Sequence, residues 1–187
     1  MLRVAHVLLS FPLLFLLLLC RSSPTAATAQ PDIVDETCNQ TASDDPNVNY
    51  TLCVDSLRSV PRSKHADLRG LAIISLRLAK ANATHAKSLA KALLKAEKAT
   101  MSGYEKSCLE TCRDLYGEAV SSLKSTVRMI KAERYVDAKV YASSAVDAPG
   151  GCEDGFQEGG IASPLAEEND YLFQLAVIAL AITSRLG

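Results

Sequence analysis

Five cysteines after residue 30 constrain the fold of this 187-residue chain more than any other feature. Cys38 and Cys53 flank a polar turn signal, so an antiparallel hairpin would bring them together. Cys108 and Cys112 are one helical turn apart and share a face, while Cys152 follows on a later helix. Either member of that pair could reach Cys152, whereas a bridge between Cys108 and Cys112 would constrain almost nothing. Because five is odd, one cysteine is left over, and we expect Cys108 to be a small buried hydrophobic residue.

The beginning of the chain reads as a targeting segment. A short basic start, an apolar run over residues 7–19 and a small-x-small site ending at Ala29 predict a secretory signal peptide over residues 1–29. The apolar run would span roughly 20 Å as a helix, less than the ~30 Å hydrocarbon core of a membrane. We therefore expect a mature domain over residues 30–187, in an oxidising compartment where cysteines pair. The sixth cysteine, Cys20, would leave with the signal peptide.

Charge and composition exclude several functions. Removal of the signal peptide takes away two arginines and no acid, which changes the formal net charge from −1 to −3. A protein that binds nucleic acid or an anionic membrane needs a basic footprint, so we expect neither partner. The chain has no Trp and few other aromatic residues, while Ala, Leu, Lys and Ser abound. This composition favours helices over a β-sandwich.

No group of residues points to catalysis or to a metal. Only His65 and His85 remain after removal of the signal peptide, and neither belongs to a nucleophile motif or to a zinc-ligand spacing. The acidic, glycine-rich segment 147–158 lacks oxygen side chains at the third and fifth positions of a calcium loop. We therefore expect no enzyme activity, no metal and no cofactor.

The apolar periodicity predicts an all-α domain. Residues 32–60 read as a short helical hairpin around a polar turn. Four longer helices follow, expected over about 66–99, over 104–130, from 134 onward and from 163 to 186. Because short loops require neighbouring helices to run antiparallel, we expect an up-down four-helix bundle over about residues 66–186 with the hairpin appended.

The last two helices carry helix breakers and capping residues. The triplet Pro149-Gly150-Gly151 should break or kink the third long helix. The last helix is expected to begin with Ser163 as its N-cap and Pro164 at its first position. Glu167 and Glu168 would then lie in the first turn, near the positive end of the helix dipole.

Three N-x-Ser/Thr triplets are present, at Asn39, Asn49 and Asn82. Each triplet alone is a weak signal, because such triplets arise by chance. Behind a signal peptide they become candidate glycosylation sites on exposed turns or helix faces.

Several motifs in this order resemble those of the plant invertase/pectin methylesterase inhibitor family over about residues 32–186. They are Cys38-x-x-Thr41, Tyr50-x-x-Cys53, Cys112-Arg113-Asp114-Leu115-Tyr116-Gly117-Glu118-Ala119, Cys152-Glu153-Asp154-Gly155-Phe156 and Leu175-x-x-x-Ala179-Leu180-Ala181-Ile182. Within the family, the invertase inhibitors of the plane-tree pollen allergen type are especially similar. They share segments like Pro46-Asn47-Val48-Asn49-Tyr50 and Ala66-Asp67-Leu68-x-Gly70-Leu71.

The resemblance implies a four-helix bundle with an N-terminal hairpin and disulfides Cys38–Cys53 and Cys112–Cys152. It also implies about one-to-one complexes with acid invertase or pectin methylesterase in the cell wall (apoplast) or, alternatively, the vacuole. Inhibition in this family works by occlusion, in which the bundle covers the active-site cleft of the enzyme.

The resemblance places target binding near the start of the third bundle helix. Cell-wall invertase inhibitors carry a Pro-Lys-Phe tripeptide there, and the corresponding stretch Glu133-Arg134-Tyr135-Val136 lacks it. Arg134 and Tyr135 are residue types enriched at interface hot spots, so they could form a cation–aromatic anchor. Tyr135 could equally pack into the bundle.

These observations rank the functions. An inhibitor of acid invertase comes first, and a pectin methylesterase inhibitor that uses the helical faces is the alternative. A bundle that has lost inhibition and serves as an interaction protein is a second class. A carrier of lipid or of a small ligand is a third, disfavoured because Ala and Leu suggest a filled core. An enzyme comes last.

Overall fold

A computed structural model describes residues 32–96 and 100–187 of the chain. The predicted signal peptide and residues 97–99 lie outside the described residues. The secondary structure elements are α2 (Ile33–Asp44), α3 (Tyr50–Arg58), the 3₁₀ helix η1 (Pro61–His65), α4 (Leu68–Ala96), α5 (Gly103–Lys131), α6 (Tyr135–Glu158) and α7 (Ala166–Ser184). The described part of the chain is helical, as the periodicity predicts.

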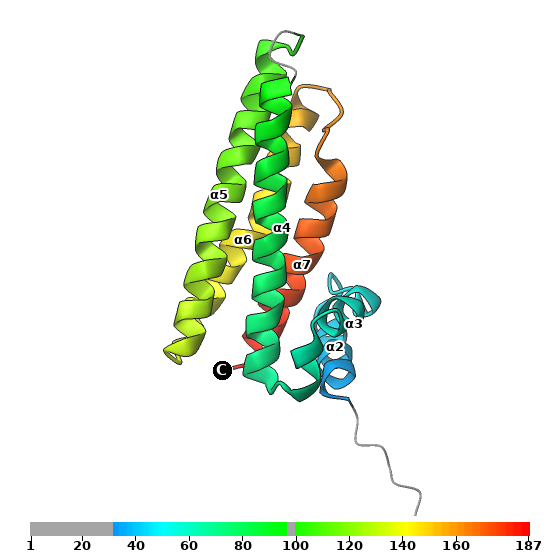
Figure 1. Cartoon of the computed structure of the whole chain (residues 1–187), viewed down its shortest axis with the longest axis vertical. Coiled ribbons are helices and arrows are strands. Elements are labelled where there is room, and N and C mark those ends of the chain that lie inside the picture. The colour runs from blue at the N-terminus through cyan, green and yellow to red at the C-terminus, as the bar shows by residue number, and fades with distance from the viewer. Residues whose placement is uncertain (1–31, 97–99) are drawn as a thin grey trace, which may run out of the picture. The chain divides into compact units, whose positions relative to one another are not determined.

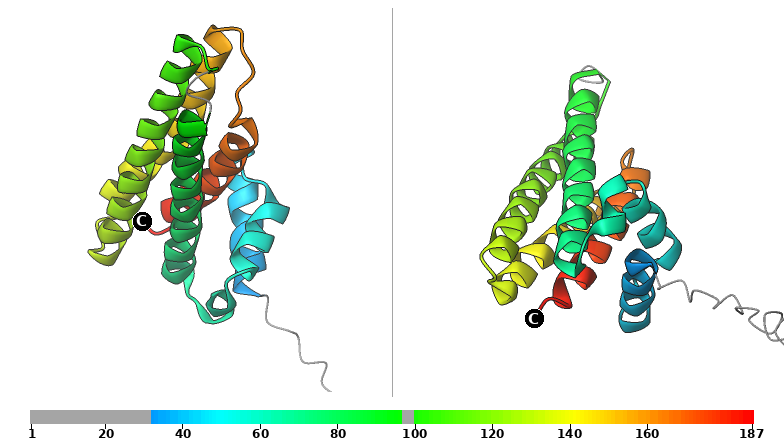
Figure 2. Two further views of the ribbon diagram at one scale, coloured as in Figure 1. Left: turned by 45° about the horizontal axis from the view of Figure 1, so that its top comes forward. Right: turned by 60° about the horizontal axis from the view of Figure 1, so that its bottom comes forward.

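Helices α4 to α7 form the expected up-down bundle. Each helix packs against two others in the ring, so that α5 lies between α4 and α6, and α7 closes the ring between α6 and α4 (Figures 1 and 2). The core is rich in alanine on two helices that lie diagonally opposite each other. On these two helices the fully or almost fully buried alanines are Ala72, Ala79, Ala83, Ala86 and Ala90 on α4 and Ala138, Ala142, Ala145 and Ala148 on α6. Small side chains at these positions let the helices approach closely.

The N-terminal hairpin, α2 with α3, packs beside the end of the bundle where α4 begins (Figure 1). Asp32 caps α2 by accepting from the Val34 N–H, and Asn49 caps α3 by accepting from the Leu52 N–H, both as Ser/Thr/Asp/Asn caps do. Arg185, which follows α7, donates to the Asp44 carboxylate at the end of α2. The contact between Arg185 and Asp44 fixes the hairpin against the bundle.

Helix α6 runs through Pro149 without the predicted break. A proline inside a helix loses one backbone hydrogen bond and crowds the preceding turn, at a cost of about 3 kcal/mol. Two tertiary anchors follow it within two turns. Cys152 is bonded to Cys112 of α5, and Phe156 is 1% exposed in the core. Tertiary packing therefore outweighs the local preference, and the prediction of a break was wrong.

Helix α7 begins three residues later than its predicted N-cap. Its N-cap position is Leu165, which has no side-chain cap, and the helix starts at Ala166. Ser163 instead accepts a hydrogen bond from the Leu165 N–H in the turn before the helix (3.1 Å). The buried Leu165 side chain (0% exposed) enters the core there, so burial fixes where the helix starts. Among the described helices, none is both long and apolar enough to span a membrane.

Candidate functional site

Both disulfides implied by the resemblance are present. Cys38–Cys53 joins the two helices of the hairpin, and Cys112–Cys152 joins α5 to α6. Cys108 is a free, buried thiol. It faces Gly155, because a Cβ placed on Gly155 would lie 3.6 Å from the Cys108 Sγ. Of the two cysteines that lie one turn apart on α5, Cys112 is therefore bridged and Cys108 is not.

A buried polar cluster surrounds the second disulfide. The Tyr116 hydroxyl donates to the Asn169 Oδ1 (2.6 Å) and lies 3.2 Å from the Cys152 Sγ. The Asn169 amide donates to that sulfur (3.2 Å) and to the Glu153 carboxylate. Burial raises the pKa of Tyr116, so its hydroxyl stays protonated at ordinary pH. The cluster ties α5, α6 and α7 together, and its members Glu153 and Asn169 also line a pocket of about 260 Å³ between α6 and α7.

The predicted target-binding stretch lies in the turn between α5 and α6. The Glu133 N–H donates to the Ile130 carbonyl (3.1 Å), and the Arg134 N–H donates to the Met129 carbonyl (2.9 Å). Glu133 has a positive φ of 59°, in the left-handed region. This is the Schellman arrangement at a helix C-terminus, in which glycine is the usual residue. The turn is thus a defined, hydrogen-bonded structure, and it presents the first turn of α6.

Two of the four residues predicted to bind the target, Glu133 and Tyr135, stabilise the turn. Arg69, on α4, donates to the Glu133 carboxylate (2.8 Å) and to the Tyr135 hydroxyl (2.7 Å). Its guanidinium also lies 5.9 Å from the centre of the Tyr135 ring, a cation–π distance. The Glu133 carboxylate and the Tyr135 hydroxyl together raise the pKa of Arg69. Tyr135 is half-buried and packs against the core, so it is a structural residue of this turn.

The other two predicted residues face outward. Arg134 holds Asp137 of its own helix (2.7 Å), with 62% of the arginine side chain exposed. Val136 is 72% exposed and Val140, one turn later, is 64% exposed. An exposed pair of β-branched apolar residues beside a cation can contact a partner protein. Sequence reasoning missed Val140, although Val136 and Val140 are spaced four apart opposite the buried alanines of α6.

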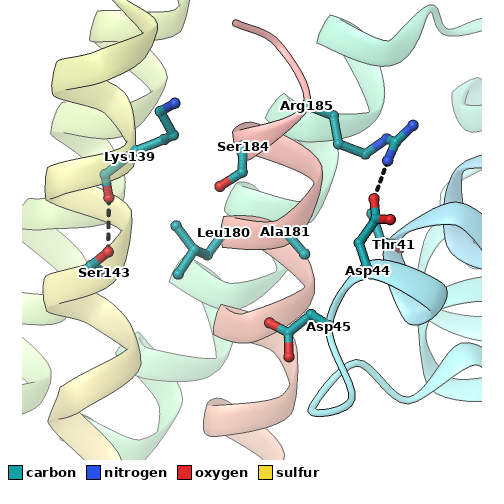
Figure 3. Close-up of a pocket in the computed structure, with 9 residues that line it drawn as sticks. All are labelled: Thr41, Asp44, Asp45, Lys139, Ser143, Leu180, Ala181, Ser184 and Arg185. Carbon is teal, nitrogen blue, oxygen red and sulfur yellow. Dashed lines mark hydrogen bonds and ion pairs between the residues drawn. The ribbon is translucent and has the colours of Figure 1, made fainter.

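A polar groove runs beside this surface, between the end of α2, α6 and α7 (Figure 3). Lys139 and Ser143 of α6 line one side, and Asp44 and Asp45 line the other. The cations of the groove are engaged within the chain, because Lys139 donates to the Gly187 backbone oxygen (2.9 Å) and Arg185 to Asp44. The groove therefore extends the outward surface of α6 toward the hairpin.

Neither histidine takes part in these arrangements. His65 ends η1 and His85 lies on the exposed face of α4. Within residues 32–96 and 100–187, no group of three or more His, Cys, Asp or Glu side chains could hold a metal ion.

The fold and the paired cysteines define a disulfide-tied helical bundle with an appended hairpin. The profile of the family described as "Plant invertase/pectin methylesterase inhibitor" matches residues 32–182, and this chain belongs to that family.

Curated relatives match over most of their length. The chain is 41% identical over 157 residues to a Platanus orientalis protein named "Putative invertase inhibitor", covering 83% of this chain and 91% of that one. It is 34% identical over 163 residues to "Pectinesterase inhibitor 12" of Arabidopsis thaliana, covering 86% of this chain and 90% of that one.

Solved structures share the fold. A mutant pectin methylesterase inhibitor from Arabidopsis superposes with a TM-score of 0.65 at 19% identity, covering 79% of this chain and 97% of that one. A second pectin methylesterase inhibitor, from Arabidopsis thaliana, gives a TM-score of 0.58 at 20% identity, over 82% of this chain and 95% of that one.

Proposed function

We propose that this protein inhibits a plant acid invertase by covering the active-site cleft of the enzyme in an about one-to-one complex. It is an inhibitor and not a catalyst, in keeping with its family. The observation that favours the invertase target is the similarity to two Platanus proteins named as invertase inhibitors, at 41% and 40% identity over 83% and 86% of this chain.

The start of α6 is the surface that suits this role. Arg134 and Val136 project from a turn whose backbone is fixed by hydrogen bonds, and Val140 continues the exposed apolar strip. A preorganised surface loses little conformational entropy on binding, which favours affinity. Arginine and apolar anchors at the centre of an interface are typical of hot spots.

The target is tested by assaying one purified sample against acid invertase and pectin methylesterase at about pH 5. The proposal expects inhibition of invertase and little effect on the esterase. A pectin methylesterase inhibitor is the second candidate, supported by the 34% identity to Pectinesterase inhibitor 12. Inhibition of the esterase alone would establish that alternative, and activity against neither enzyme would indicate a non-inhibitory interaction protein.

The surface is tested with the double substitution Arg134→Ala and Val136→Ala. Truncation of two hot-spot residues should weaken invertase inhibition by about ten-fold or more, because each costs upwards of ~1 kcal/mol. The matched control is Lys106→Ala with Ile161→Ala, an exposed cation and an exposed apolar residue at the other end of the bundle. If the two double variants inhibited invertase equally well, the α6 surface would not be the surface that binds the enzyme.

We further propose that residues 1–29 direct export and that residues 30–187 act in the cell wall or, alternatively, the vacuole. Export would allow glycosylation, and the three sequons differ in their surroundings. Asn39 is exposed on α2, and Asn49 is exposed and uses only its Oδ1 to cap α3. The Oδ1 of Asn82 is enclosed without a hydrogen-bond partner. We expect glycans at Asn39 and Asn49 before Asn82, which intact mass before and after deglycosylation would measure.

A further inference from the structure

Charge is strongly segregated among the helices, although the chain as a whole is almost neutral. Helix α4 contains six Lys and Arg residues and no Asp or Glu. Helices α6 and α7 together contain eight acidic residues and one lysine. A formal net charge of −1 therefore hides a basic side of the bundle.

Five of the α4 cations lie along one edge of that helix. At 100° per residue they fall within an arc of about 80°. They are Arg77, Lys80, Lys87, Lys91 and Lys95. Lys87 reaches across toward α5, because a Cβ placed on Gly117 would lie 2.6 Å from the Lys87 Nζ. This edge of α4 therefore adjoins α5.

The adjoining part of α5 is basic as well. The two helices run antiparallel side by side (Figure 1). Lys80 lies two turns before Lys87, and Lys124 lies two turns after Gly117, so Lys80 and Lys124 stand at the same level. Arg128 and Lys131 continue this row toward the end of α5. We call these eight cations the basic face: Arg77, Lys80, Lys87, Lys91, Lys95, Lys124, Arg128 and Lys131.

Two carboxylates near the basic face are engaged by other cations. Asp114 pairs with Arg113 (2.9 Å), which lowers the pKa of Asp114, with Lys87 adding to the effect. Glu110 lies 3.8 Å from Lys106. Among the described residues, none of the eight cations has a carboxylate oxygen within 4.0 Å. Like charges at adjoining positions repel one another, so a bound polyanion would relieve this repulsion.

We propose that the basic face binds an acidic polysaccharide with carboxylates along its chain, a polyuronate such as demethylated pectin. The row on α4 from Arg77 to Lys95 is about 27 Å long, which suits an extended chain. Six of the eight cations are lysines, which act as point charges, whereas arginine forks suit phosphates. No exposed aromatic or other large apolar residue of the described chain lies on α4, so base stacking and membrane insertion have no support there.

This inference rests on the proposed export to the cell wall, and binding there would hold the inhibitor where it is needed. The test measures binding of the full mature protein to polygalacturonate by calorimetry at about 20 mM and 150 mM NaCl. Fully methyl-esterified pectin, which lacks the charges, is the comparison ligand. The proposal expects binding to polygalacturonate that weakens about ten-fold or more between the two salt concentrations, and none to the ester.

The informative variant is Lys80→Glu with Lys91→Glu, both exposed on α4, and it should lose at least ten-fold in affinity. The matched control is Arg62→Glu with Lys64→Glu on η1, which makes the same change in charge outside the basic face and should bind like the wild type. Thermal melts of both variants serve as the check that they fold. Failure of the wild type to bind polygalacturonate, or equal loss in both variants, would overturn the proposal, as would tighter binding to DNA or to anionic vesicles at equal charge.

The same variants separate this inference from the proposed function. In the ring of helices, α4 packs against α5 and α7, and it reaches α6, which carries the proposed invertase surface, through the Arg69 side chain at the end of the bundle, far from Lys80 and Lys91. Lys80→Glu with Lys91→Glu should therefore inhibit invertase as the wild type does. Loss of polygalacturonate binding with full inhibition supports two separate surfaces, and binding without any inhibition would refute only the proposed function.

Discussion

Arg69, the second residue of α4, donates to the Tyr135 hydroxyl at the start of α6 at a distance of 2.7 Å. This contact joins two helices that lie diagonally opposite each other and closes the end of the bundle. It also accounts for the orientation of Arg134 and Val136, because the tyrosine between them is turned inward. Of the two candidate roles of Tyr135, anchor or packing residue, its contacts with Arg69 and the core favour packing.

The substitution Tyr135→Phe should lower the free energy of unfolding by about 1–2 kcal/mol, since it removes one charge-assisted hydrogen bond and keeps the ring. Arg134→Ala, whose side chain is mostly exposed, should change stability by less than about 0.5 kcal/mol. Urea unfolding measures both. A Tyr135→Phe variant as stable as the wild type would mean that the Arg69 contact contributes nothing in solution.

Glu133 offers a second test of the same turn, because its positive φ places an ordinary residue where glycine is favoured. Glu133→Ala loses the exposed ion pair with Arg69, which contributes little, and keeps the backbone strain. Glu133→Gly loses the same pair and relieves the strain. We expect the glycine variant to be more stable than the alanine variant by about 1 kcal/mol in thermal or urea unfolding. The reverse order would show that the turn differs from this conformation.

The sequence predicted the fold well because helix positions depend on regular features. The spacing of Leu and Ala residues locates the long helices within a few residues of their observed ends, except for the end of α6. Pro149 and Ser163 were misjudged because their local preferences compete with the Cys112–Cys152 bridge and the buried Leu165, which are tertiary contacts. Rules based on the local sequence contain no information about such contacts.

The candidate surfaces were harder to predict. Tyr135 and Val136 are adjacent in sequence, yet the tyrosine packs inward and the valine is 72% exposed. Which of the two side chains is buried depends on how α6 is rotated against the neighbouring helices. The basic face escaped notice because the net charge averages over helices of opposite sign. Its two rows, on α4 and α5, are brought together only by their antiparallel packing.

The stability of the hairpin should depend on pH through Asp32, which caps α2 and pairs with Arg58 of α3. Its carboxylate accepts from the Val34 N–H and pairs with Arg58 (3.0 Å), and these contacts hold its pKa below the ordinary value of 3.8. A lowered folded-state pKa means that the stabilisation is fully present above the unfolded value and is lost as the pH falls through the folded value.

The isosteric variant Asp32→Asn keeps the helix cap and removes the charge. The wild type should be the more stable of the two at about pH 6, and the difference should vanish toward about pH 2. Unfolding curves across this range measure it. If the difference in the free energy of unfolding did not change with pH, the effect would come from the helix cap alone.

Cys108 and Gly155 provide the final prediction, because they face each other one turn beyond the Cys112–Cys152 bridge. A Cβ at Gly155 would lie 3.6 Å from the Cys108 Sγ, so a thiol at this position would be a direct neighbour of Cys108 and could reach bonding distance with a small shift. The variant Gly155→Cys should therefore form a third bridge when the protein is refolded under oxidising conditions. The count of free thiols in denaturant would fall from one in the mature wild type to none, and a non-reducing peptide map would identify the linked peptides. Gly150→Cys, at an exposed position with no neighbour near its Cβ, is the matched control and should retain two free thiols. Two free thiols in Gly155→Cys would mean that α5 and α6 differ in register from the arrangement described.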